Sequence, residues 1–84
     1  MPKPNPANAS VARRLVQARE AAGLSFDAAV IRLAMHPQTY GYHEQGVTSV
    51  KPAELRRYAE AFGVSYGWLT TGIGMGPKKS DCGP

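Results

Sequence analysis

The fold is decided by the stretch Tyr58-Ala59-Glu60-Ala61-Phe62-Gly63-Val64-Ser65-Tyr66-Gly67-Trp68-Leu69-Thr70-Thr71-Gly72. Apolar side chains recur in it at helical spacing as far as Phe62, and Gly63 suits the left-handed position that ends a helix. Ser65 then supplies a side-chain oxygen that can cap a very short helix over residues 66–70. A helix that ends at glycine and is soon followed by a new cap predicts packed short helices rather than a sheet.

The same signals recur upstream of this stretch. We expect four earlier helices over residues 11–22, 26–34, 37–44 and 52–62. Ser10 and Ser25 can cap the first two, while Pro37 and Pro52 suit the first position of the next two. The chain is therefore predicted to be all-α, a compact bundle of five short helices.

The chain is long enough for one domain. Its 84 residues divide into a proline-rich arm over 1–9, a folded domain over 10–72 and a glycine-containing tail over 73–84. We expect the arm and the tail to be disordered, because neither has an apolar pattern to bury. The formal net charge of +4 suits a nucleic-acid partner without requiring one.

Several classes of protein do not fit the composition. One cysteine and two histidines cannot assemble a zinc site, so we expect neither a metal nor a cofactor. Paired carboxylates beside a histidine, a nucleophile motif and a phosphate-binding glycine loop are all missing, so we do not expect an enzyme. No apolar run approaches the roughly 20 residues of a membrane helix, and the N-terminus does not resemble a signal peptide. The expected location is therefore the cytoplasm, with no membrane partner.

Separate motifs carry a family resemblance. They are A-R-E-A-A-G-L-S at 18–25, E-Q-G at 44–46, K-P at 51–52 and the stretch quoted above at 58–72. In this order they resemble the phage repressor/Cro-like helix-turn-helix family (XRE-type, lambda-repressor-like) over residues 11–72. The resemblance implies binding to double-stranded DNA, with residues 37–44 as the recognition helix in the major groove.

The resemblance implies roles for residues of that recognition helix. The implied base-reading set is Pro37, Gln38, Thr39, Gly41 and Tyr42. Gln38 is the best candidate because its amide can donate and accept at once, as N7 and N6 of adenine require. An exposed glutamine that contacts only water is the alternative. Tyr40 falls at the family's inward position and is expected in the core.

Phosphate contacts are expected on either side of the recognition helix. The implied donors are the backbone N–H of Phe26 and the residues Gln45, Thr48, Ser49 and Lys51. Only Lys51 brings a positive charge, so we predict modest non-specific affinity. Arg32, Arg56 and Arg57 are interpreted as solvated helix faces.

The remaining roles are structural. The family's pairing of a first-helix Arg with a third-helix Glu falls here on Arg19 and Glu44, behind the DNA-reading surface. The expected dimer contact is Tyr66, Trp68 and Leu69, although the last two are also core candidates. His43 is interpreted as a hydrogen-bonded structural histidine rather than a pH-sensitive element.

Two hypotheses for the function follow. The first is a sequence-specific transcriptional regulator, most simply a repressor, that binds a palindromic operator as a homodimer. The second is a protein-interaction module on the same fold, such as an antitoxin-like or scaffold partner, with weak or no DNA binding. Phe26 favours the second, because the family usually has a phosphate-binding glutamine there. Salt dependence distinguishes them, since phosphate-anchored binding weakens steeply as salt rises.

Overall fold

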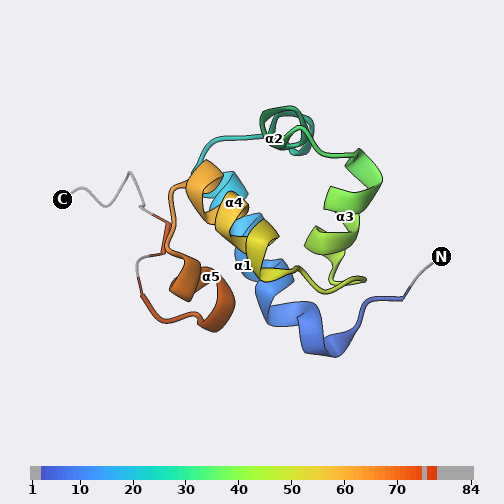
Figure 1. The fold of residues 1–84 in the computed structure, drawn as a ribbon, viewed down its shortest axis with the longest axis vertical. Coiled ribbons are helices and arrows are strands. Elements are labelled where there is room, and N and C mark those ends of the chain that lie inside the picture. Colours follow the sequence, from blue (N-terminus) through green and yellow to red (C-terminus); the bar gives the residue numbers. More distant parts are fainter. Residues whose placement is uncertain (1–2, 75, 78–84) are drawn as a thin grey trace.

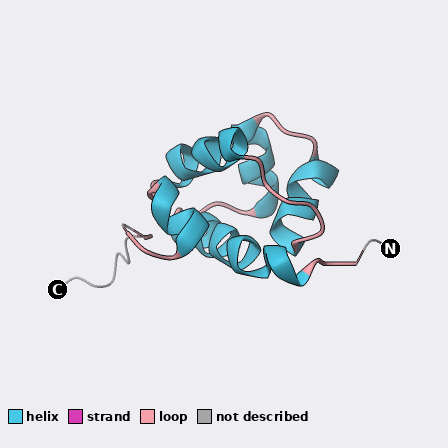
Figure 2. Ribbon diagram, turned by 60° about the horizontal axis from the view of Figure 1, so that its bottom comes forward, coloured by secondary structure: helices cyan, strands magenta, loops and turns pink. Residues whose placement is uncertain are grey.

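The computed structural model describes residues 3–74, 76 and 77. Its elements are the 3-10 helix η1 (Pro6–Asn8) and the α-helices α1 (Ala9–Ala21), α2 (Phe26–Leu33), α3 (Pro37–Gln45), α4 (Pro52–Phe62) and α5 (Tyr66–Thr71). The described residues contain no strand, and short loops join the helices (Figure 2). The predicted all-α bundle of five helices is therefore confirmed.

The helix ends follow the local signals in the sequence. The hydroxyl of Ser25 accepts from the backbone N–H of Ala28 at 3.1 Å, and that of Ser65 from Trp68 at 3.0 Å. Gly46 and Gly63 close α3 and α4 with φ of 76° and 72°, the left-handed conformation that glycine adopts without a steric penalty.

The N-terminal segment differs from the expectation of an extended arm capped at Ser10. Helix α1 already begins at Ala9, and a 3-10 turn precedes it. The side chain of Asn5 caps this turn by accepting from the backbone N–H of Ala7 at 2.9 Å, and Pro6 holds φ in the helical range. Most of the predicted tail, residues 75 and 78–84, lies outside the described residues.

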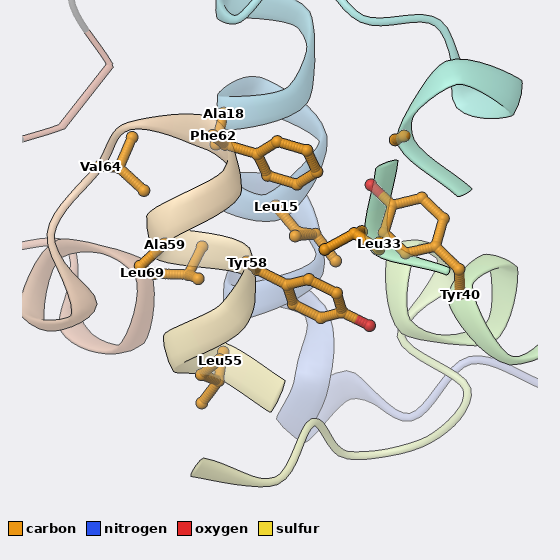
Figure 3. Packing of buried hydrophobic residues seen from close by; sticks show 11 residues of the cluster. Leu15, Ala18, Leu33, Tyr40, Leu55, Tyr58, Ala59, Phe62, Val64 and Leu69 are labelled. Atoms are coloured by element: carbon orange, nitrogen blue, oxygen red, sulfur yellow. The ribbon is translucent and has the colours of Figure 1, made fainter. Parts of the chain in front are cut away.

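The core lies between α1 and α4, which run side by side at the centre of the molecule (Figure 1). Figure 3 shows Leu15, Tyr58 and Phe62 meeting there, with Leu33 and Tyr40 reaching in from α2 and α3. The ring of Tyr58 stacks on Phe62 and meets Tyr40 edge-on, with centroids 6.3 and 5.6 Å away. Each large side chain buried in this way contributes roughly 1.5–3 kcal/mol to folding.

Aromatic side chains pack between α2 and α3. The ring of Phe26 lies 5.3 Å from that of Tyr40, centroid to centroid. A Cβ atom at Gly41 would be 3.5 Å from the Phe26 ring. That distance is an ordinary van der Waals contact, so the Phe26 ring covers α3 directly at Gly41.

Arginine side chains hold helix ends together. Arg14 donates to the carbonyls of Leu69 and Thr70, at 3.0 and 2.9 Å, in the last turns of α5. Cations are favoured there because the C-terminal end of a helix is the negative end of its dipole.

The interpretation of the other arginines as solvated faces is incomplete. Arg32 donates to the Ala61 carbonyl and Arg57 to the Leu33 carbonyl, so α2 and α4 each send an arginine to the other's C-terminal end. The guanidinium of Arg56 lies over the Tyr66 ring, 5.5 Å from its centroid. These side chains are exposed, but their donors face protein groups as well as solvent.

Candidate nucleic-acid interface

A short turn leads from α2 into α3. Ala34 ends α2 in the left-handed conformation, and His36 precedes Pro37 in an extended conformation. The Nδ1 atom of His36 accepts from the backbone N–H of Gln38 at 3.1 Å, so a histidine caps this helix. The cap and the proline together fix where the first turn of α3 points.

The first turn of α3 presents its side chains to solvent. Pro37, Gln38 and Thr39 are all exposed, and Tyr42 is half-buried one turn later. The Gln38 side-chain amide donates to the Tyr42 hydroxyl at 3.0 Å. One N–H and the carbonyl oxygen of that amide remain for another partner, which is the pair of groups that adenine requires.

The expectation that Gly41 reads bases is wrong. Gly41 is buried, and its Cα faces the Phe26 ring rather than the outer surface of α3. The expectation came from the family resemblance, which includes Gly41 among the base-reading positions. The close neighbour of Gly41 is a side chain of the same protein.

A charged network fixes α3 to α1. Arg19 Nε lies 2.6 Å from Glu44 Oε2, so the two charges paired by the resemblance do meet. The Tyr40 hydroxyl donates to the same carboxylate oxygen at 2.5 Å, and Arg19 also donates to the Leu24 carbonyl at 3.0 Å. Burial and the Glu44 carboxylate raise the pKa of Tyr40, so the hydroxyl stays protonated and continues to donate.

His43 fastens the last turn of α3 to α4. It is 4% exposed, and its Nδ1 atom lies 2.6 Å from the Tyr58 hydroxyl. Its Nε2 atom lies 3.7 Å from a carboxylate oxygen of Glu54. Burial lowers the pKa of His43, and the Glu54 charge opposes that shift without cancelling it. The histidine is thus hydrogen-bonded in the core, in a neutral form at pH 7.

The loop after α3 holds the expected phosphate donors. Gln45, Thr48, Ser49 and Lys51 are all exposed. Ser49, however, donates its hydroxyl proton to Asn8 Oδ1 at 3.0 Å, so it cannot give that proton to a phosphate at the same time. Phe26 is the first residue of α2, where backbone N–H groups are not used by the helix itself.

Two residues at this loop were missed by the sequence reasoning. The backbone N–H of Asn5 and the side chain of Asn8 both donate to the Gly46 carbonyl, at 2.8 and 3.2 Å. No local pattern could reveal these contacts, because the partners are far apart in the chain.

The expected dimer contact is only partly available. Leu69 of α5 is fully buried in the core. It cannot touch a second copy, so the expectation that it contributes to the dimer contact is wrong. Tyr66 is exposed and Trp68 half-buried. Beside Tyr66, a shallow hollow of about 420 Å³ is lined by Arg56, Ala59, Glu60, Val64 and Tyr66.

A short turn thus joins a supporting helix to a helix whose start is exposed, and the sequence that forms them matches a known family. A helix-turn-helix domain family matches residues 10–67. The chain belongs to this helix-turn-helix family. The match is consistent with the repressor/Cro-like resemblance and indicates a DNA-binding regulator. Domains of this family are ordinarily not enzymatic.

Searches of curated proteins and of solved structures find no match to the chain. Among the described residues, no helix is long and apolar enough to cross a membrane.

Proposed function

We propose that this helix-turn-helix protein is a sequence-specific repressor that reads the major groove of DNA with the first turn of α3. The observation that carries the proposal is the contrast between the two sides of that helix. Pro37, Gln38 and Thr39 face solvent together, whereas Tyr40 and His43 are buried and hold the helix in place. A rigid helix with an exposed polar start is what groove reading requires.

Gln38 is the proposed base reader. Its hydrogen bond to Tyr42 limits the rotation of the amide before DNA arrives, so less rotamer entropy is lost on binding. The remaining N–H and the carbonyl oxygen fit adenine, and Thr39 beside it can contact a thymine methyl group or a phosphate. Tyr42 can donate to a phosphate or stack on a sugar.

Phosphate contacts are assigned to the groups that flank α3. They are the backbone N–H of Phe26 at the start of α2, together with Gln45, Thr48 and Lys51. Lys51 is the one positively charged side chain of this set, so non-specific affinity should be modest and base contacts should carry a large share of the binding.

The protein is proposed to act as a homodimer on a palindromic operator. Two recognition helices then lie about 34 Å apart, one turn of DNA. Exposed Tyr66 and the hollow beside it, with half-buried Trp68 nearby, offer the surface for the second copy. Sedimentation with and without the operator tests this part, which fails if the protein stays monomeric in both.

The test of base reading is a random-library DNA selection followed by anisotropy titrations across a salt series. For the wild type we expect an enriched palindrome and an affinity that falls as salt rises. Gln38→Ala should lose about 1–3 kcal/mol of discrimination at one base position and keep the salt slope. Gln17→Ala, an exposed glutamine on α1, is the matched control and should bind like the wild type. Equal base preference in the two variants would contradict the role of Gln38.

The second candidate is a protein-interaction module. It is favoured by the use of four arginines, Arg14, Arg19, Arg32 and Arg57, on backbone carbonyls of the protein itself. It is also favoured by Ile31 on α2, whose side chain is 78% exposed. If no DNA sequence is enriched and binding stays weak at low salt, this candidate replaces the first.

A further inference from the structure

The segment before α1 packs against the C-terminal end of α3. Figure 1 shows this segment, in blue, beside the loop that follows the green helix α3. The Gly46 carbonyl at the end of α3 accepts two hydrogen bonds from the segment, one from the Asn5 backbone and one from the Asn8 side chain. The segment thus closes the end of the recognition helix.

Asn8 binds the loop at two points. Its amide nitrogen donates to the Gly46 carbonyl at 3.2 Å, and its amide oxygen accepts from the Ser49 hydroxyl at 3.0 Å. Gly46 has φ of 76°, and a Cβ atom there would lie 3.5 Å from Ala12 and 3.7 Å from Asn8. One half-buried side chain therefore sets both the position and the direction of residues 46–49.

This loop carries the proposed phosphate contacts. Thr48 lies between the two points that Asn8 holds, and Lys51 follows shortly after them. Fixing the backbone of a flexible residue costs conformational entropy. A loop already held in place by Asn8 does not lose that entropy when it meets DNA, so the tie should strengthen phosphate binding.

We infer that Asn8 is a positioning residue for DNA binding, which orders the loop at 46–49 so that Thr48 and Lys51 meet the phosphate backbone. Ser49 then acts by bonding to Asn8 rather than by donating to DNA. The inference rests on the proposed function and extends the DNA-binding surface to the N-terminal segment.

The test uses the full chain and the operator selected for the wild type. Asn8→Ala should weaken binding about tenfold, as expected when two hydrogen bonds that hold a loop are lost. The slope of log affinity against log salt should become shallower by about one for each bound copy, because the Lys51 phosphate contact of that copy is loosened. The base preference set by Gln38 should not change, which a general loss of folding would not reproduce.

Ser49→Ala removes one of the two ties and should weaken binding less than Asn8→Ala does. The double variant should bind like Asn8→Ala alone, because the two residues act through the same bond. Ser10→Ala, an exposed polar residue two positions beyond Asn8, is the matched control and should leave affinity unchanged. Ser49→Ala lies in an exposed loop and still provides the test if Asn8→Ala does not fold.

The outcomes separate this inference from the function on which it rests. If Asn8→Ala and Ser49→Ala lower the free energy of unfolding but keep wild-type affinity and salt slope, the segment only supports the fold and the inference is overturned. If the wild type itself selects no sequence, the proposed function has failed and the inference falls with it. The two failures are distinguishable because the second is visible without any variant.

Discussion

Ala34 has a strained backbone conformation. Its φ of 54° is the one positive value at a non-glycine residue there. The left-handed conformation costs an L-residue roughly 1–2 kcal/mol, because Cβ approaches the following carbonyl oxygen. The strain lies in the turn between α2 and α3, where the chain must reverse before Pro37.

Ala34→Gly should stabilise the protein by about 0.5–1 kcal/mol. The substitution relieves the strain of the left-handed conformation, and the greater chain entropy of glycine in the unfolded state offsets part of that gain. Urea denaturation followed by circular dichroism measures this free energy of unfolding. Ala22→Gly is the matched control, since Ala22 is also exposed and ends a helix but has φ of −79°. That control should be neutral or destabilised, and a loss of stability in Ala34→Gly would refute the argument.

At the scale of the element, α3 is held by polar groups as well as by the packing of the Tyr40 ring in the core. The buried Tyr40 donates its hydroxyl proton to Glu44 of the same helix. The buried His43 bonds to the Tyr58 hydroxyl of α4. Arg19 and Glu44 then join α3 to α1. Such bonds are directional, so they fix the rotation of the helix as well as its position.

Glu44→Ala should destabilise the protein by about 2–4 kcal/mol, because the partly buried charge of Arg19 and the hydroxyl of Tyr40 lose their common acceptor. Glu44→Gln keeps one acceptor oxygen and should cost less. Chemical denaturation of both variants measures the difference, with Glu20→Ala as the control because Glu20 is exposed on α1. Equal stability of Glu44→Ala and Glu20→Ala would show that the network contributes nothing.

The sequence predicts elements better than it predicts contacts between them. The ends of α2, α4 and α5 could be located because Ser25, Gly63 and Ser65 act on neighbouring backbone groups. The bond between Asn8 and Ser49 joins residues 41 positions apart, and no periodicity encodes it. The same limit explains Gly41, whose neighbour Phe26 is brought to it only by the packing of α2 on α3.

On the scale of the whole molecule, several of the arginines behind the formal net charge of +4 also serve the fold. Arg14, Arg32 and Arg57 each donate to carbonyls near the C-terminal end of another helix. These arginines retain their charge, but some of their N–H groups are already bonded to backbone carbonyls of the protein. The bundle is therefore stabilised by some of the same arginines that make the chain basic.

The buried histidine gives the whole fold a dependence on pH. His43 must take up a proton on unfolding in acid, because burial lowers its pKa in the folded protein below the ordinary value of 6.5. Its contribution is fully present above pH 6.5 and is lost progressively as the pH falls from there through the lowered pKa. We therefore expect the urea midpoint to decrease between pH 7 and pH 5.

His43→Gln isolates this effect, since a neutral amide can still bond to the Tyr58 hydroxyl but does not titrate. The variant should be less stable than the wild type at pH 7, where its packing is imperfect, and its midpoint should change less between pH 7 and pH 5. The chain has two histidines, and His36→Asn removes the other while keeping a side chain that can cap α3. That control should keep the acid decline. If His43→Gln declines as steeply as the wild type, the acid sensitivity belongs to other groups and the neutral state of His43 does not contribute to folding.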